Sequence, residues 1–329
     1  MSGTTGRPLK NPFRTFAERH LAEIAPFRSV ETVREKGRKL RQLERIVDEL
    51  YARGQIPSRN PKRFDAATIA ALLKWFEAHG WALTYRTQFL NHLNGLLRHV
   101  GNAAIDSLRQ RGLLNLDPGP QPIVPKDEAW LRDALHKLEP LEGWTAEVVR
   151  FAIQAYIGTG LRPKELRLAK LADLDTQTWW MRVSVPKGLG RWASGGDRIL
   201  VTDDVRPAFL DFLDRRERHL RSLGLDPNAV EPLVPNVDGR YYTGSGWSRA
   251  RYIIFRKAGI VGDYRILRPS FAKDLKSMGV GIESVSRMLR HTSVTTTEKF
   301  YARMEAADAW SEAASRKAAR KNRLITEKS

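Results

Sequence analysis

The residues best suited to chemistry in this sequence are two well-separated arginines, a histidine and a tyrosine. Arg162 follows a Thr-Gly-Leu segment and Arg268 precedes a proline. His291 lies ten residues before Tyr301. A phenol oxygen can attack phosphorus, and guanidinium groups can neutralise the non-bridging oxygens of a phosphodiester and stabilise its pentavalent transition state. The set therefore suggests covalent chemistry on a phosphodiester.

Cleavage of a phosphodiester also needs a general acid, because the leaving sugar alkoxide must be protonated. Lys187 lies in a glycine-rich segment expected between two strands, from which it could reach a phosphate or a leaving oxygen. Lys170 and Arg191 are nearby alternatives. A metal could supply part of the charge, but the sequence has no His/Asp/Glu cluster with ligand spacing. We therefore expect neither a metal nor a cofactor.

Each of these residues also has a simpler interpretation. Tyr301 follows Phe300 and could be an ordinary core aromatic. Arg162 and Glu165 are spaced for an ion pair on a helix, and His291 could cap a helix C-terminus. Lys187 could be a solvated lysine in a turn. The spacing between His291 and Tyr301 favours the active-site interpretation.

The composition points to a polyanionic partner. The chain has 329 residues and a net charge of +19, from 56 Lys+Arg against 37 Asp+Glu. Such an excess fits nucleic acid better than an acidic substrate or a membrane surface. No apolar run approaches the roughly 18 residues that span a bilayer, and the N-terminus lacks the apolar core of a secretory signal. The absence of cysteine excludes disulfides and fits a cytoplasmic location.

The N-terminal part of the chain is expected to be helical. Residues 1–30 are polar and basic and are predicted to form a flexible arm. Apolar periodicity then predicts a compact helical domain over 31–115, with Asp65 and Thr84 as helix caps. Residues 116–125 hold four prolines in ten positions, which predicts a linker.

The C-terminal part is expected to mix helices with a small β-hairpin. The domain would cover 126–304, and residues 305–329 would form a basic helix or tail. Alternation over Trp179–Val185 predicts a strand that pairs with a second strand over 198–201. Pro163 suits the first turn of a helix, which would place Arg162 at its start. Further helices are predicted from Thr145 to the glycines at 158 and 160, and over 204–222, 245–258, 268–278 and 282–290.

Four segments of the sequence resemble the conserved boxes of the tyrosine recombinases, also called phage-type integrases, and they follow one another in the same order as in that family. Their first arginine box resembles Thr159-Gly160-Leu161-Arg162-x-x-Glu165-Leu166, and their second, usually His-x-Leu-Arg-His-x-Phe-Ala, resembles Arg265-Ile266-Leu267-Arg268-Pro269-Ser270-Phe271-Ala272. The stretch that normally reads Leu-Gly-His resembles Leu289-Arg290-His291, and the nucleophile segment resembles Thr296-Thr297-Glu298-Lys299-Phe300-Tyr301. The resemblance covers about residues 30–305 and implies the family's helical DNA-binding domain and mixed α/β catalytic domain.

The resemblance implies how strand cleavage would proceed. Tyr301 would attack the scissile phosphate and form a 3′-phosphotyrosyl bond, and Lys187 would protonate the leaving 5′-oxygen. The phosphotyrosyl bond conserves the energy of the phosphodiester, so strand exchange would need no ATP.

The resemblance also implies which residues hold the phosphate. Arg162 and Arg268 would clamp it, and His291 would hydrogen-bond to it. Glu165 would support the Arg162 side of the site from behind.

Two residues depart from the family pattern. Arg265 stands where the family usually has His or Lys, and arginine stays protonated near neutrality, which makes it a poor general base. Arg265 could instead clamp the phosphate or contact the DNA backbone, while water or the phosphate takes the proton of Tyr301. Arg290 replaces the usual glycine before His291 and could narrow the pocket or contact DNA.

The resemblance implies a DNA-associated, cytoplasmic site-specific recombinase, such as the integrase of a mobile element. Its partners would be double-stranded DNA and three further copies of the chain, joined on two DNA sites through the C-terminal helix. Two alternatives stay open. One is a DNA-relaxing enzyme of the type IB topoisomerase kind, and the other is a non-catalytic DNA-binding relative.

Overall fold

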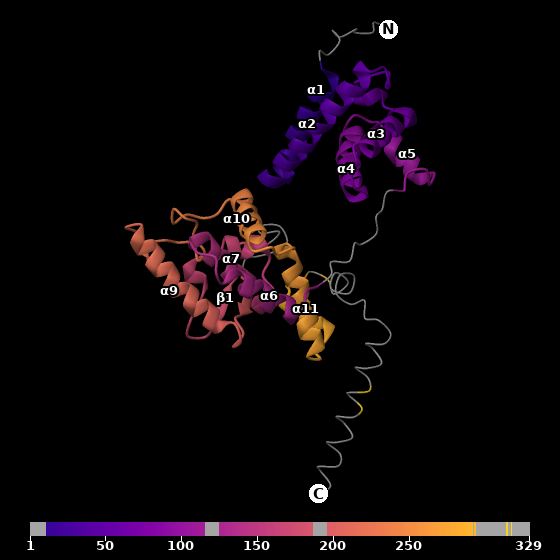
Figure 1. Cartoon of the computed structure of the whole chain (residues 1–329). Coiled ribbons are helices and arrows are strands. Elements are labelled where there is room, and N and C mark those ends of the chain that lie inside the picture. Colours follow the sequence, from indigo (N-terminus) through magenta and orange to yellow (C-terminus); the bar gives the residue numbers. More distant parts are fainter. Residues whose placement is uncertain are drawn as a thin grey trace. The chain divides into compact units, whose positions relative to one another are not determined.

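The chain folds into two compact units, Met1–Gln121 and Pro122–Ser329. A computed structural model (Figure 1) describes residues 11–115, 125–186 and 196–291, together with Ser293, Ala314 and Lys317. The predicted linker at 116–125 lies outside the described residues except for Pro125, as do residues 1–10 of the predicted arm. Of the predicted C-terminal helix, only Ala314 and Lys317 are described, and both are helical.

The described part of unit 1 contains helices and no strand. Local signals in the sequence account for where several of its helices begin. The side chains of Ser29 and Asp65 accept hydrogen bonds from the backbone N–H groups of Thr32 and Thr68, which is how such residues cap helix N-termini. Thr84, which was expected to cap a helix, lies inside the helix that spans Leu83–His99, and Ala82 takes the cap position. The α-helices are α1 (Pro12–Ile24), α2 (Val30–Ala52), α3 (Ala66–Ala78), α4 (Leu83–His99) and α5 (Ala104–Gln110).

The first of these helices corrects the expectation of a flexible arm over residues 1–30. Pro12–Ile24 form α1, which packs on α2 and α4 and contributes the fully buried Phe13 to the core of unit 1. Asn11 caps this helix, and Pro12 stands in its first turn, where the missing N–H costs nothing. The polar composition hid the helix because only Phe13, Ala17 and His20 are buried in it.

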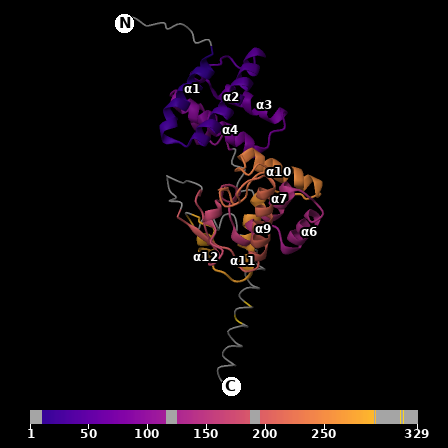
Figure 2. The same cartoon turned by 90° about the vertical axis from the view of Figure 1, so that its left-hand side faces the viewer.

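Unit 2 is built around helix α7 (Trp144–Thr159). The surrounding α-helices are α6 (Glu128–Leu138), α8 (Pro163–Arg167), α9 (Arg206–Ser222), α10 (Gly244–Lys257), α11 (Leu267–Ser277) and α12 (Ile282–Met288). Of these, α6, α9, α10 and α11 pack against α7 (Figures 1 and 2). The fully buried Tyr156 of α7 accepts a hydrogen bond at the phenol oxygen from Trp247 Nε1 at 3.1 Å, and Phe151 stacks on Phe212 with ring centroids 3.9 Å apart.

The described part of unit 2 contains one two-stranded antiparallel sheet, of β1 (Trp180–Arg182) and β2 (Arg198–Leu200). Met181 pairs with Ile199, and both side chains are buried in the core of unit 2. The strand predicted over Trp179–Val185 is therefore present but shorter. Trp179 has a φ of 60°, outside the extended region, so β1 begins only after it.

The remaining helix predictions are confirmed to within a few residues. Short 3₁₀ helices connect the elements over Ala25–Phe27, Pro61–Arg63, Leu171–Asp173 and Tyr264–Ile266. The expected cap Thr145 is itself helical, because α7 begins one residue earlier, after Gly143. Helix α6 had not been predicted. Among the helices of the described ranges, none is both long and apolar enough to cross a membrane.

Candidate active site

The turn between α7 and α8 carries the first predicted site arginine. Helix α7 ends at Gly160, whose φ of 60° is favourable for glycine and costly for other residues. A Cβ at this position would lie 2.5 Å from Cδ1 of Phe271, so the turn packs directly on α11. Arg162 is the N-cap residue of α8, with Pro163 in the first turn, as predicted. This turn fixes where the Arg162 side chain begins.

Glu165 holds Arg162 in place from the first turn of α8. The Arg162 backbone N–H donates to Glu165 Oε2 at 2.8 Å, and Arg162 Nη1 donates to Oε1 at 2.8 Å. The Glu165 side chain is only 1% exposed, whereas that of Arg162 is 23% exposed. Burial alone would raise the pKa of Glu165, but the charges of Arg290 and Arg162 and the Arg162 N–H bond outweigh it and lower the pKa. Glu165 is therefore a buried carboxylate.

Arg268 is anchored by backbone carbonyls from two other elements. Its guanidinium donates to the carbonyl oxygens of Gly160, after α7, and Leu289, after α12. The residue is buried and lies in the first turn of α11. Carbonyl acceptors orient a guanidinium without cancelling its charge, since they are neutral. Arg268 thus brings a buried positive charge to the same turn that presents Arg162.

The C-terminal end of α12 contributes two further residues. The Arg290 backbone N–H donates to Arg287 O, and the His291 N–H donates to Ser286 O at 3.0 Å, so the chain turns back after the helix. Arg290 has a φ of 54°, in the left-handed region, at the position where helices usually end on glycine. Its Nη2 donates to Glu165 Oε2 at 2.7 Å. The sequence had marked this residue as a departure without revealing its partner.

His291 lies among these cations as a neutral imidazole. Burial, followed by the charges of Arg268, Arg162 and Arg290, lowers the pKa of His291 to about 4. The half-buried ring is therefore uncharged near neutrality and can donate one hydrogen bond to an anion. The structure thus gathers Arg162, Arg268 and His291 from three elements distant in sequence, and adds Arg290 and Glu165 behind them. We call these five residues the arginine cluster.

Arg265 makes its described contacts elsewhere. Its Nε donates to Asp263 Oδ1 at 3.0 Å, and its side chain is 78% exposed. Arg265, the first residue of the second arginine box, therefore pairs with the carboxylate of Asp263, two positions earlier in the chain. The box pattern does not reveal this local contact.

The predicted nucleophile, Tyr301, and the predicted general acid, Lys187, lie outside the described residues, as does Arg191, one alternative to Lys187. The other alternative, Lys170, forms an ion pair with Glu231, with Nζ and Oε1 2.6 Å apart.

Unit 1 contains a group of side chains, from distant parts of the sequence, with the residue types that hold a cation. His20, Glu23 and His99 bring their ligand atoms within 4.8 Å of one another. However, Lys36 Nζ lies 3.0 Å from His20 Nε2, and His99 Nδ1 already contacts Glu23. An ammonium group beside the imidazole disfavours a metal ion, and we assign no metal to this group.

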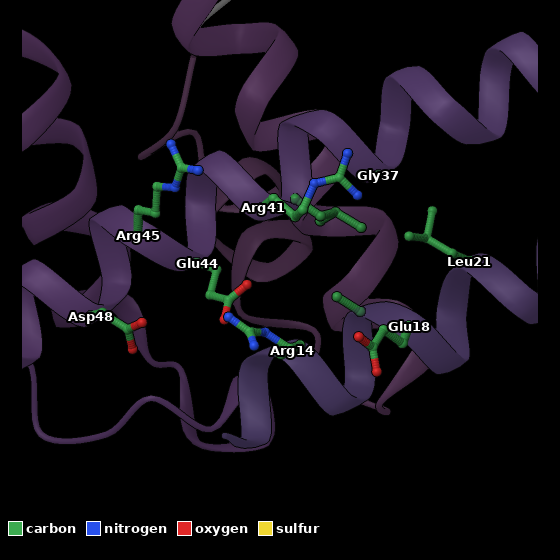
Figure 3. A pocket seen from close by; sticks show the side chains of 10 residues that line it. Arg14, Glu18, Leu21, Gly37, Arg41, Glu44, Arg45 and Asp48 are labelled. Atoms are coloured by element: carbon green, nitrogen blue, oxygen red, sulfur yellow. The ribbon is translucent and has the colours of Figure 1, made fainter. Parts of the chain in front are cut away.

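Unit 1 also has a cleft of about 190 Å³ between α1 and α2. Figure 3 shows that Arg14 lies beside Glu44 at its edge, and their Nε and Oε1 atoms are 2.9 Å apart. Arg41 and Leu21 also line it. The charges at this cleft are of both signs and are partly paired, so it offers no site for a phosphate.

Comparisons with known proteins identify the fold. No protein-family model matches the sequence, and no curated protein matches it. Solved structures do match. The Tn1549 transposon integrase, in complex with circular intermediate DNA, is 17% identical with a TM-score of 0.64, over 90% of this chain and 98% of that one.

Two further structures have the same architecture. The XerH site-specific recombinase, in a post-cleavage complex with a difH substrate, is 17% identical with a TM-score of 0.61, over 94% of this chain and 98% of that one. A lambda integrase dimer bound to a core site is 15% identical with a TM-score of 0.56, over 86% of this chain and 96% of that one. The predicted fold class, mainly helical with a small antiparallel sheet, is confirmed.

Proposed function

We propose that this chain, which has the fold of the tyrosine recombinases, is a DNA breaking-rejoining enzyme that acts as a site-specific recombinase or integrase. The arginine cluster carries the proposal. Two guanidinium groups and a neutral imidazole meet at one turn of unit 2, the combination that binding an anionic phosphodiester requires.

The cluster suits a phosphate better than a carboxylate or a neutral ligand. Arg162 is partly exposed, Arg268 is buried and fixed by carbonyl groups, and His291 is uncharged. Permanently charged forks stabilise the extra negative charge of a pentavalent transition state, and their fixed orientation avoids reorganisation during the reaction. Binding through such groups carries no base specificity, so target choice must come from other contacts.

In the proposed reaction, the Tyr301 phenol oxygen attacks the scissile phosphorus. The bond from phosphorus to the 5′-oxygen breaks as the new bond to tyrosine forms, leaving a 3′-phosphotyrosyl link. Lys187 gives its proton to the leaving 5′-oxygen. Because an arginine is a poor general base, the phenol proton passes to water or to a phosphate oxygen. Reversal with a 5′-hydroxyl from another strand rejoins the DNA without a cofactor.

The proposed partner is double-stranded DNA, and recombination would require four copies of the chain on two sites. The net charge of +19 supports a polyanionic partner. The three similar structures are of proteins bound to DNA. The segment after residue 304, rich in alanine and basic residues, is our candidate for the contact between copies.

The decisive experiment traps the covalent intermediate. The protein is incubated with a nicked suicide duplex from the flanks of its encoding gene, and adducts that survive denaturant are resolved by electrophoresis. We expect an adduct with the wild type and none with Tyr301→Phe. Tyr252→Phe is the matched control, because Tyr252 is an exposed tyrosine on α10.

Each result is informative. If the wild type and Tyr301→Phe both give no adduct but still bind the duplex, the protein is a non-catalytic DNA-binding relative. An adduct together with relaxation of supercoils, but no recombinant products from two-site plasmids, would identify a topoisomerase-like enzyme instead.

A further inference from the structure

Arg290 occupies a backbone position that disfavours it. The residue follows the end of α12 with a φ of 54°, where a side chain strains the backbone and glycine does not. The sequence nevertheless has arginine there, and the side chain is 7% exposed. A long charged residue in such a conformation must be held by its contacts.

Those contacts are with Glu165 and with the end of α12. Arg290 Nη2 donates to Glu165 Oε2 at 2.7 Å, and Nη1 donates to Met288 O at 3.1 Å. Glu165 Oε1 is left to Arg162, whose Nη1 lies 2.8 Å away. One buried carboxylate therefore has two cations, one on each oxygen.

The two cations differ in their freedom to move. Arg290 is almost entirely enclosed, whereas Arg162 is 23% exposed and can turn toward a ligand. If Arg162 were the sole partner of Glu165, moving it to a phosphate would leave a buried carboxylate unpaired, which is strongly unfavourable. The attraction of Glu165 would therefore oppose the movement of Arg162 toward the phosphate.

We propose that Arg290 is a positioning residue that serves as the permanent counter-ion of Glu165 and so releases Arg162 to bind the scissile phosphate. This inference rests on the proposed function. It gives a physical reason for an arginine at a left-handed position. The ion pair of Arg290 with Glu165 offsets the backbone strain, and Arg162 is then not needed as the partner of Glu165. Arg290 acts through Arg162 and does not itself contact the phosphate.

The first test is a charge-balance cycle on the full chain. In the Arg290→Gly variant, glycine fits the left-handed backbone at position 290, so the protein should fold. The variant leaves Arg162 as the sole cation paired with Glu165. We expect single-turnover adduct formation at saturating DNA to slow by about tenfold or more, because Arg162 then stabilises the charge of the transition state less well. Arg287→Ala, which removes an exposed arginine of α12, is the control and should change the rate less than about twofold.

The double variant Arg290→Gly with Glu165→Gln should recover most of the lost rate, because a neutral amide no longer retains Arg162. All rates are compared at a temperature where circular dichroism shows every variant folded. A rate unchanged in Arg290→Gly, or a double variant no faster than Arg290→Gly, would overturn the inference.

A second measurement does not depend on cleavage. Nitrogen-15 spectra of the arginine side chains are recorded while inorganic phosphate is added to the wild type, with Arg290→Gly and Arg162→Lys to assign the signals. We expect the Arg162 Nε–H signal to move and that of Arg290 to stay. Movement of both signals to the same extent would show direct phosphate contact by Arg290 and refute its positioning role, even if the wild type forms no adduct.

Discussion

At the scale of single residues, the members of the arginine cluster owe their charge states to different physical causes. Glu165 stays ionised although buried, since Arg290 and Arg162 outweigh the effect of burial on its pKa. His291 stays neutral, since burial and the neighbouring guanidinium groups act in the same direction. A neutral imidazole can donate to a phosphate oxygen without adding to the repulsion among the arginines.

The lowered pKa of His291 predicts how the free energy of unfolding depends on pH. Its folded-state pKa of about 4 lies below the ordinary value of 6.5, so between these values the unfolded chain binds a proton that the folded chain does not. The contribution of His291 to stability is therefore complete above about pH 6.5 and is lost as the pH falls toward 4.

The measurement is urea unfolding of the full chain at pH 7 and pH 5. Because burial and Lys36 also lower the pKa of His20 to about 4, the comparison must be made with variants. His291→Gln should lose less stability on acidification than the wild type, and His136→Gln, at an exposed histidine of α6, should behave as the wild type does. An equal loss in wild type and His291→Gln would contradict the prediction.

At the scale of elements, the turn after α7 positions the two arginines of the site. Gly160 ends the helix in a left-handed conformation, contacts α11 closely, and supplies a carbonyl to Arg268. Arg162 follows two residues later. One turn therefore sets the positions of both arginines, and no residue with a Cβ fits there without movement of Phe271.

Gly160→Ala should accordingly be destabilising by about 2–4 kcal/mol, from the left-handed backbone and from overpacking. The matched control is Gly224→Ala, because Gly224 has a φ of 72° and a Cβ added there would have no atom within 4 Å. The control should lose only about 1–2 kcal/mol, the cost of the left-handed conformation alone.

Urea denaturation of both variants gives the comparison, and the difference between them isolates the packing against Phe271. Equal losses would mean that the α7–α11 contact can relax. We also expect Gly160→Ala to weaken adduct formation, since it moves the Arg162 turn.

At the scale of the whole molecule, two units with separate cores share one excess of positive charge. The core of unit 1 is formed mainly by helices, and that of unit 2 mainly by helices and the hairpin. The net charge of +19 favours any polyanion, because neutralising phosphates releases their condensed counter-ions. Affinity and site choice should therefore have separate physical origins.

This predicts a steep dependence of duplex binding on salt. For roughly six to ten phosphate contacts, the logarithm of the binding constant should fall with the logarithm of the NaCl concentration with a slope of about −5 to −9. Fluorescence anisotropy of a labelled duplex between 50 and 200 mM NaCl measures it. A slope near −1 would show that phosphate contacts do not dominate.

Much of the fold followed from the sequence, because the signals concerned are local. Asp65 caps α3, Pro163 opens α8, and Gly160 ends α7, each through contacts within about a turn of the helix. Helix α1 was missed because its buried face is narrow and its composition polar. The order of the arginine boxes also indicated the fold that the solved structures confirm.

The sequence by itself placed most of the helices and the hairpin, and it singled out the residues that we propose for one site. Only the tertiary structure decided how their charges are paired. Arg290 meets Glu165 across 125 positions of the chain, and Arg268 meets the Gly160 carbonyl across 108. Propensity and spacing act over one or two turns, whereas these contacts depend on how α7, α11 and α12 pack. For that reason the sequence could present Arg290 only as a departure from a pattern, while the packing gives it a buried carboxylate to hold.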